Sequence, residues 1–267
     1  MSSLTKLLSI LDFFCPDTAV LSAEEIIARL GSSRPQGYRY IHELCTAGLL
    51  TRFSGAYSLG PRIIELDFVI RSADPLLAAS EPLIRELRDR LGCDVLLANI
   101  FGDRVVAIHH ERSDVTEFVG FGRGRPMPLF SGAGCKIILA NLPVARQKRL
   151  FLKYPEEVEA SKLGRSWEEF RTELRRIRRA GYASSLGELD STNAGIAAPV
   201  FHEAGVPPAA LILVMPRARY DAGNPAMVAQ IVVDVASRIT QRAEQRRRGV
   251  AGFLASHRAP AASRSSR

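Results

Sequence analysis

The feature that most constrains this chain is a pair of short helices, separated by only a brief turn, within its first fifty residues. The first helix is predicted to begin at the capping box Ser22-Ala-Glu-Glu25 and to end at Gly31. A second capping box, Ser33-Arg-Pro-Gln36, begins another helix that is predicted to end near Ala47. Two short helices joined by such a turn form the helix-turn-helix pattern.

The flanking segments complete a winged version of this pattern. Apolar residues at helical spacing predict a preceding helix over about residues 4–15, which Pro16 ends. Two strand-like runs within residues 49–59 flank Ser54-Gly55, a pair typical of hairpin turns. Three helices followed by a hairpin predict a winged helix-turn-helix domain over residues 1–60.

The second helix of the pair is predicted to present a DNA-reading face. At 3.6 residues per turn, one stripe of this helix must face the core: Gly37, Ile41, Leu44 and Cys45. Arg39 lies almost opposite that stripe, and residues 29–62 hold five Arg against one Glu, a net charge of +4. Arg and Gln side chains read base edges, whereas hydroxyl groups and a helix N-terminus hold phosphates. The predicted DNA contacts are Ser33, Arg34, Gln36, Arg39, His42 and Arg52.

The rest of the chain predicts a second domain. Residues 61–74 are predicted to form a linker helix, punctuated by Asp74-Pro75. Residues 75–246 alternate between helical patterns and strand-like runs, with turns at Gly102-Asp103 and around Gly205. Antiparallel strands with helices packed around them make an α+β domain that is large enough for its own core.

Most of the basic excess lies at the C-terminal end. The net charge of the chain is +8, and residues 240–267 supply +6 of it through seven Arg and one Glu. Residues 247–267 lack apolar periodicity, so we predict a disordered basic tail there. Two interpretations of the tail stay open: a non-specific arm on DNA, or a solvated chain end.

Several classes of protein are excluded by absent patterns. No run of 18 apolar residues occurs, and the N-terminus does not resemble a signal peptide, so we expect no membrane partner. The four cysteines are far apart and form no CxxC pair, which argues against a zinc finger and against a disulfide framework. We therefore predict a protein of the reducing cytoplasm.

No set of residues in the sequence converges on catalysis, a metal or a cofactor. His109-His110-Glu111 contains two candidate metal ligands, but neighbouring strand residues point to opposite faces and cannot share one ion. Glu188 and Asp190 lie close together without a nucleophile and base beside them. We expect no catalytic residue, no metal and no cofactor.

One segment favours a ligand. Residues 120–134 are rich in Gly, Pro and Arg, Arg125 among them, and they lead into a helix that begins near Ser131-Gly132-Ala133. A helix N-terminus leaves amide donors unsatisfied and suits a carboxylate, and glycines let a ligand approach the backbone. The alternative is a plain turn before a helix.

Four segments together resemble the IclR family of bacterial transcriptional regulators. Gly55-Ala-Tyr-Ser-Leu-Gly60 resembles its wing motif G-x-Y-x-L-G, and Tyr38-Arg39 resembles the Y-R pair of its recognition helix. Residues 129–140 are similar to its segment L-H-A-T-A-x-G-K-A-x-L-A. Gly181-Tyr-Ala183, Glu188 and residues 195–201 resemble its block G-Y-A…E…G-x-A-A-P-V-F. The resemblance adds Tyr38 to the predicted DNA contacts.

The resemblance implies a winged helix-turn-helix, a linker helix and a GAF-like effector-binding domain. It also implies a homodimer or a dimer of dimers, a double-stranded DNA operator, and a small organic acid as effector, with aromatic acids among the candidates. Where the family motif has His, Thr and Gly, this chain has Phe130, Gly132 and Cys135, which favours an effector with an apolar body and one carboxylate. The predicted effector contacts are Arg125, Ser131, Gly132, Ala133, Glu188, Asn193, Ile196 and Ala197.

The sequence therefore predicts a DNA-binding regulator whose occupancy of DNA is changed by a small acid. Two alternatives stay open. One is a regulator with a degenerate pocket that binds DNA without any effector, and the other is an enzyme on the C-terminal domain. Neither the operator, nor the effector, nor the sign of regulation follows from the sequence.

Overall fold

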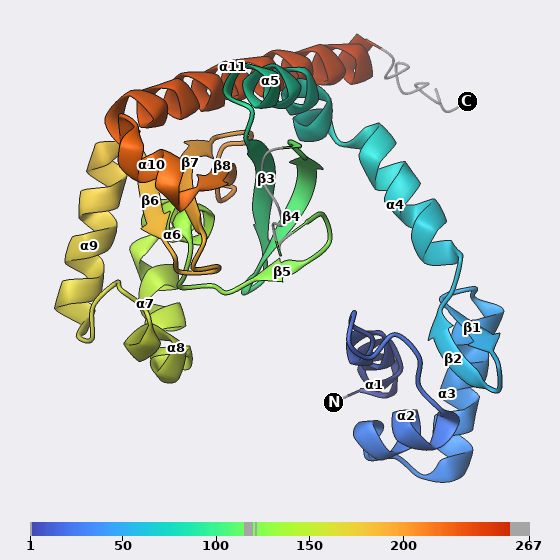
Figure 1. Ribbon diagram of the computed structural model, residues 1–267. Coiled ribbons are helices and arrows are strands. Elements are labelled where there is room, and N and C mark those ends of the chain that lie inside the picture. The colour runs from blue at the N-terminus through green and yellow to red at the C-terminus, as the bar shows by residue number, and fades with distance from the viewer. Residues whose placement is uncertain (1, 115–119, 121, 257–267) are drawn as a thin grey trace, which may run out of the picture. The chain divides into compact units, whose positions relative to one another are not determined.

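The computed structural model describes residues 2–114, 120 and 122–256, with side chains to residue 248 (Figure 1). The chain divides into two compact units, residues 1–74 and residues 75–267. Among the described residues, no helix is both long and apolar enough to cross a membrane.

The first unit is a winged helix-turn-helix followed by one further helix, as predicted. Its core gathers apolar residues from every element before the last helix, with Ile10, Ile26 and Ile41 at its centre. Ser54 and Gly55 both have positive φ, at 48° and 84°, which matches the tight turn that joins the two strands of the wing. The elements are α1 (Ser3–Ser9), a 3₁₀ turn (Ile10–Phe13), α2 (Ala23–Leu30), α3 (Arg34–Thr46), β1 (Leu50–Phe53), β2 (Ala56–Leu59) and α4 (Arg62–Ala73).

The turn between α2 and α3 depends on one close approach. A Cβ atom on Gly37 would lie only 2.3 Å from the side-chain carbon Cγ1 of Ile27. Glycine therefore lets α3 pack directly against α2. The first predicted capping box is confirmed, because Ser22 Oγ accepts a hydrogen bond from the backbone N–H of Glu25 and the Glu25 carboxylate accepts one from the backbone N–H of Ser22.

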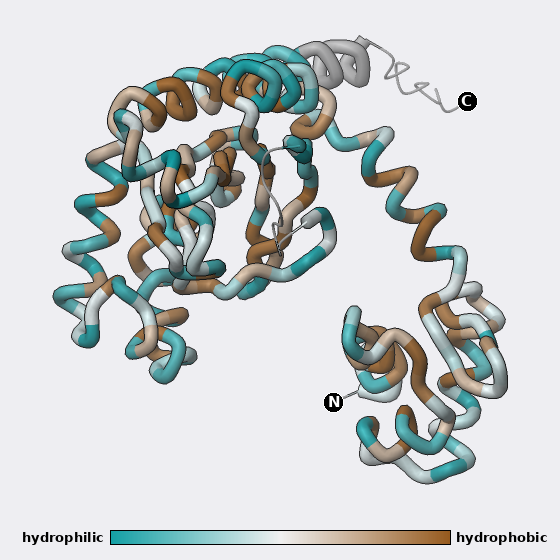
Figure 2. Tube along the Cα trace, in the orientation of Figure 1, coloured by the Kyte–Doolittle hydropathy of each residue, from teal (hydrophilic) through white to brown (hydrophobic). Residues whose placement is uncertain are grey.

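The second unit is built on one six-stranded antiparallel sheet with the order β5-β4-β3-β8-β7-β6. Both faces of the sheet are covered, so its central strands are apolar almost throughout (Figure 2). The strands are β3 (Asp94–Phe101), β4 (Arg104–Glu111), β5 (Pro126–Met127), β6 (Ala183–Leu186), β7 (Asn193–Val200) and β8 (Ala209–Pro216).

Two sets of helices cover the two faces. Helices α5 and α11 pack side by side on one face, and α6 packs on the other with α7, α8 and α9 (Figure 1). Each face has its own hydrophobic core. The helices are α5 (Pro75–Leu91), α6 (Ala133–Asn141), α7 (Val144–Lys153), α8 (Pro155–Ala160), α9 (Trp167–Ala180), α10 (Arg217–Ala222) and α11 (Pro225–Ser256). The predicted fold class is confirmed: α+β, with a winged helix-turn-helix, a connecting helix and an α+β C-terminal domain.

The last helix is longer than its sequence pattern predicted. We expected the C-terminal domain to end at residue 246 and a disordered tail to follow. Helix α11 instead continues to Ser256, past the Arg246-Arg247-Arg248 run. Its apolar stripe on α5 and the sheet ends at Ala243, which is why periodicity alone placed its end too early. The rest of the predicted tail, residues 257–267, lies outside the described residues.

Candidate DNA-reading face and effector pocket

The outer face of α3 is exposed and basic. Arg34, Arg39 and His42 are exposed on α3, and Arg52 is exposed on β1 of the wing. The predicted buried stripe is confirmed for Gly37, Ile41 and Leu44, while Cys45 is half-buried. Four predicted contacts are thus free of the core and available to a partner.

The other predicted contacts on α3 are tied to neighbouring side chains. Gln36 Nε2 donates a hydrogen bond to Tyr40 Oη at 2.9 Å, and Tyr38 Oη donates one to Glu24 Oε1 of α2 at 3.0 Å. That bond to a carboxylate raises the pKa of Tyr38. Tyr40 is buried, and the Arg39 guanidinium stacks 5.6 Å above its ring centre. The helical angle alone did not identify Tyr40 as the residue that positions both Gln36 and Arg39.

The predicted capping box at the start of α3 is wrong. The side chain of Ser33 makes no capping hydrogen bond, and the side chain of Gln36 donates to Tyr40 Oη. Ser33 is itself exposed. The Ser33 hydroxyl therefore does not contribute a hydrogen bond to the start of α3.

The second unit contains a cavity of about 520 Å³, counting the space at its mouth. It lies beside the N-terminus of α6, against the sheet and the segment that joins β6 to β7. Its apolar lining is Leu96, Met127, Ala133, Leu189, Ala194, Ile212 and Val214, and its polar side chains are Ser185, Glu188, Asp190 and Asn193. Mixed lining of this kind is typical of small-molecule sites.

The N-terminus of α6 is not open, contrary to our expectation. Glu188 Oε2 accepts a hydrogen bond from the backbone N–H of Gly132 at 3.0 Å, and Glu188 Oε1 accepts one from Lys136 Nζ at 2.5 Å. The side chains of Lys136 and Glu188 are only 8% and 9% exposed. A carboxylate does sit at this helix N-terminus, but it belongs to the chain itself.

The structure brings only part of the predicted effector set to this cavity. Ala133, Glu188 and Asn193 line it. Gly132 lies directly behind Leu189, whose Cδ1 would be 2.7 Å from a Cβ on that glycine. Ser131 lines a different surface hollow, beside Phe130.

Three predicted effector contacts are not among the residues that line the cavity. Arg125 is exposed, and its guanidinium donates a hydrogen bond to the Gly120 carbonyl at 2.9 Å. Ile196 packs in the core under α5 and α11, whereas Ala197 packs in the core under α6. Successive residues of β7 face opposite sides of the sheet, so the family motif placed Ile196 on the wrong side of it.

Sequence reasoning missed Ser185. This serine is 8% exposed, lines the cavity, and its hydroxyl has no hydrogen-bond partner in the described part of the chain. Its partner in the sheet register is Gly195, where a Cβ would lie 2.9 Å from Ser185 Oγ. Glycine at this position keeps the space in front of the hydroxyl. Only the pairing of β6 with β7 reveals this, and β6 itself was not predicted.

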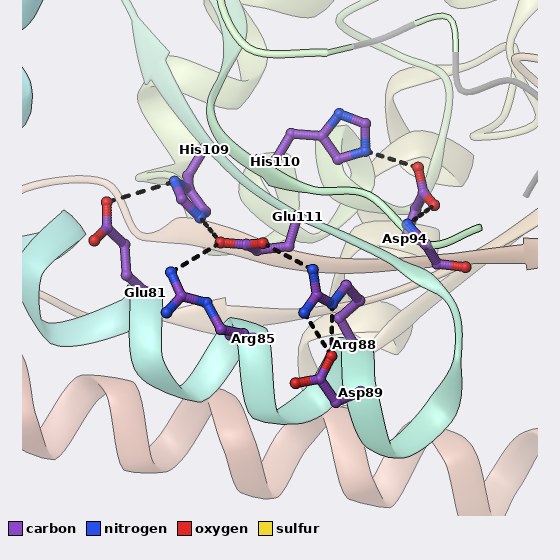
Figure 3. A network of polar contacts seen from close by, with 9 residues as sticks. Glu81, Arg85, Arg88, Asp89, Asp94, His109, His110 and Glu111 are labelled. Atoms are coloured by element: carbon purple, nitrogen blue, oxygen red, sulfur yellow. Dashed lines mark hydrogen bonds and ion pairs between the residues drawn. The ribbon is translucent and has the colours of Figure 1, made fainter. Parts of the chain in front are cut away.

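The two histidines of β4 lie on opposite sides of the strand, as predicted (Figure 3). His109 Nε2 lies 3.2 Å from Glu111 Oε1, in a network that also includes Arg85 and Arg88 of α5. His110 Nε2 lies 2.7 Å from Asp94 Oδ2 on the other side. Within the described residues, no group of three His, Cys, Asp or Glu side chains could hold a metal ion. These contacts join α5, β3 and β4.

The folded chain thus combines a basic winged helix-turn-helix with an α+β unit that contains a mixed cavity. Comparison with known families agrees with both halves. Residues 3–52 match the family described as the IclR helix-turn-helix domain, and residues 69–241 match the one described as Bacterial transcriptional regulator IclR C-terminal. The chain belongs to the IclR family of bacterial transcriptional regulators.

Individual relatives are consistent with this assignment. The chain is 25% identical over 247 residues to the HTH-type transcriptional regulator KipR of Bacillus subtilis, which covers 90% of this chain and 96% of that protein. It is 24% identical over 214 residues to the Pca regulon regulatory protein of Pseudomonas putida, covering 79% and 73%. The first of these relatives is named as a transcriptional regulator and the second as the regulatory protein of a regulon, and the chain, as a member of this family, is a regulator and not an enzyme.

Solved structures share the fold. An IclR homolog of Microbacterium hydrocarbonoxydans complexed with 4-hydroxybenzoate has a TM-score of 0.72 at 23% identity, and covers 91% of this chain and 100% of its own. An IclR family transcriptional regulator of Brucella abortus has a TM-score of 0.73 at 20% identity, covering 90% and 92%.

Proposed function

We propose that this regulator binds a specific double-stranded DNA operator and that a small organic acid, with aromatic acids among the candidates, changes its occupancy. The observation that carries the proposal is one chain with both an exposed basic α3 and a cavity that holds a carboxylate at a helix N-terminus. Such coupling requires two states of the protein with different affinities for the acid. A bacterial regulator that binds chromosomal DNA acts in the cytoplasm.

The exposed side chains of α3 and the wing support the operator contacts. Arg39 and His42 are placed to reach base edges in the major groove, whereas Arg34, Ser33 and Arg52 suit phosphates. Gln36 and Tyr38 also face outward from α3, and their hydrogen bonds to Tyr40 and Glu24 would orient them.

The lining of the cavity supports an acid with an apolar body. Apolar side chains dominate the lining, and a few polar side chains lie among them, as in sites for small molecules. The N–H of Gly132 and the ammonium of Lys136 already stabilise one carboxylate there. A fold relative was solved with 4-hydroxybenzoate, which belongs to the same class of ligand.

We also infer that the chain forms a homodimer or a dimer of dimers. Helix α4 exposes several large apolar side chains, of which Ile64 is 74% and Phe68 is 69% exposed. Apolar surface of this kind on one helix marks a contact with another protein surface. A second copy of the chain is the partner that an operator with two half-sites requires. Light scattering should show a dimer or tetramer, and Ile64→Ser with Phe68→Ser should lower that mass.

The test of the function uses an operator that the wild-type chain selects from a random DNA library. Its affinity is then measured with and without a panel of acids, from acetate to 4-hydroxybenzoate. We expect at least one acid to change operator affinity about fivefold or more. If acids leave both melting temperature and operator affinity unchanged, the alternative of a regulator without an effector replaces this proposal.

A further inference from the structure

The most polar part of the C-terminal cavity is filled by a carboxylate of the chain itself. Glu188 accepts hydrogen bonds from the Gly132 backbone and from Lys136, at 3.0 Å and 2.5 Å. A buried ammonium needs a nearby anion, and a helix N-terminus favours one. The N-terminus of α6, beside Lys136, therefore requires a carboxylate, either from the chain itself or from a ligand.

A second feature indicates that the cavity is built for a ligand. Ser185 is only 8% exposed and lines the cavity, and its hydroxyl makes no hydrogen bond within the described residues. Buried polar groups are normally hydrogen-bonded, and Gly195 leaves room in front of this one. The Ser185 hydroxyl is therefore available to form a hydrogen bond with a ligand in the cavity.

The charges of the cavity oppose a second acid beside Glu188. Lys136 is already neutralised by Glu188, and Asp190 adds another carboxylate to the lining. None of the described lining residues is a cation. An acid that entered while Glu188 stayed in place would meet the uncompensated charge of Asp190 and would find no free cation in the lining.

We propose that Glu188 is a resident carboxylate that an acid effector must displace. The inference rests on the proposed function and adds the way in which the site selects acids. The effector carboxylate takes over the N–H of Gly132 and the ammonium of Lys136, and Glu188 moves out of the cavity. One anion replaces another, so the buried charge stays balanced.

The exchange also opens apolar space. Leu189 follows Glu188 in the chain and lies against Gly132, where it fills the volume next to the helix N-terminus. Residues 187–193 are held together locally, because the N–H of Gly187 donates to the carbonyl of Asn193 and Asp190 accepts hydrogen bonds from the backbone and side chain of Thr192. When Glu188 leaves, Leu189 leaves with it, and the effector body occupies the vacated space. Acid binding thus moves the segment between β6 and β7.

The experiment compares acids with their amides on the full-length chain. Each pair has the same shape, from acetate and acetamide to 4-hydroxybenzoate and 4-hydroxybenzamide, and affinities are measured by calorimetry. Glu188→Gln removes the resident charge, so we expect the acids to bind about tenfold more tightly while the amides change less than about threefold. Asp190→Asn is the matched control, because it removes a carboxylate of the same cavity that makes no bond to α6.

Each result decides the question. If Glu188→Gln and Asp190→Asn increase the affinity for acids equally, the gain reflects only general charge repulsion, and the proposal is overturned. Unchanged affinity for acids in Glu188→Gln also overturns the proposal. In either case, acid binding to the wild-type chain would leave the proposed function intact. If no acid binds to the wild-type chain or to Glu188→Gln, the proposal of an acid effector is refuted, and this inference is refuted with it.

A double variant keeps the test valid if Glu188→Gln does not fold. Glu188→Gln with Lys136→Met leaves no charge unpaired. We expect it to bind each acid no more tightly than the corresponding amide, because the cation has gone. A retained preference of this double variant for acids overturns the proposal.

Discussion

Helices α3 and α6 begin in opposite ways, and the difference reflects what each helix has to bind. The N-cap residue of α3 is Ser33, which is exposed and makes no capping bond, so a partner can approach the first turn of α3 from solvent. The N-cap residue of α6 is Gly132, and the buried carboxylate of Glu188 already satisfies its N–H. A DNA phosphate can bind to α3 directly, whereas an effector must exchange with a group of the chain.

The charged side chains of the two helices differ in the same way. Arg39 and His42 of α3 point outward and have no anionic partner among the ion pairs of the described residues. Lys136 of α6 points inward and is paired with Glu188 at 2.5 Å. Exposed charges cost little to leave unpaired, but buried ones are expensive. Substitutions at the two helices should therefore affect different properties.

The largest effect is expected at the buried pair. Lys136→Met leaves the Glu188 carboxylate without its cation, and we expect the free energy of unfolding to fall by roughly 3–5 kcal/mol. Denaturant unfolding measures this loss. The matched control is Lys153→Met, which removes a 55% exposed side chain and should hardly change the curve, because Arg149 still pairs with Asp103. Equal losses in the two variants would contradict the distinction between buried and exposed pairs.

Binding to DNA is expected to depend on the outer face of α3. Arg39→Ala should weaken specific operator binding by about 1–3 kcal/mol, because an arginine that bonds a base edge contributes about that much. Folding should be unchanged, since Arg39 is exposed. The measurement is a salt-matched binding assay, with Arg90→Ala on α5 as a control that removes an equal charge from the other unit. Operator affinity that equals the control would refute the assignment of Arg39.

Ser22 and Ser33 are the N-cap residues of α2 and α3, but only Ser22 makes a capping hydrogen bond. Ser22→Ala removes a capping hydrogen bond and should destabilise α2 by about 1 kcal/mol. Ser33→Ala removes none, and its effect on stability should stay within about 0.5 kcal/mol. Hydrogen exchange of the α2 and α3 amides reports each loss locally. If Ser33→Ala weakens operator binding without a loss of stability, its hydroxyl is a DNA contact.

The smallest effect concerns the partly exposed pair of Lys153 and Asp103 and its pH dependence. The hydrogen bond from Lys153 lowers the pKa of Asp103, which joins the turn between β3 and β4 to α7. A lowered folded-state pKa gives stability that is present above the ordinary aspartate value of about 3.9 and is lost as the pH falls below it. Asp103→Asn should therefore lower the melting temperature by less than about 2 °C at pH 7 and by less still at pH 3. If Asp103→Asn lowers the melting temperature equally at pH 7 and pH 3, the charge of Asp103 is not the cause of the loss.

Helix periodicity and capping residues predicted most of the fold. The boundaries of α2, α3 and α4 agree with the prediction to within about two residues, because capping residues, glycine or proline lie near their starts or ends. Strand β6 was missed, since Ala183–Leu186 is too short and too mixed to show alternation. The capping box at Ser33 was wrong for a different reason: Gln36 donates a hydrogen bond to Tyr40, four residues further along the same helix, and the capping pattern does not decide between the two partners.

The sequence by itself determined the architecture, the reading helix and the segment that forms the N-terminus of α6, because these depend on local spacing and on residue types near each other in the chain. The tertiary structure decided the contents of the pocket. Glu188 and Lys136 are 52 residues apart, and Ser185 faces Gly195 only through strand pairing. Long-range contacts of this kind depend on the register of the sheet and on which side of it each residue faces. A pattern of residues along the chain does not contain that information.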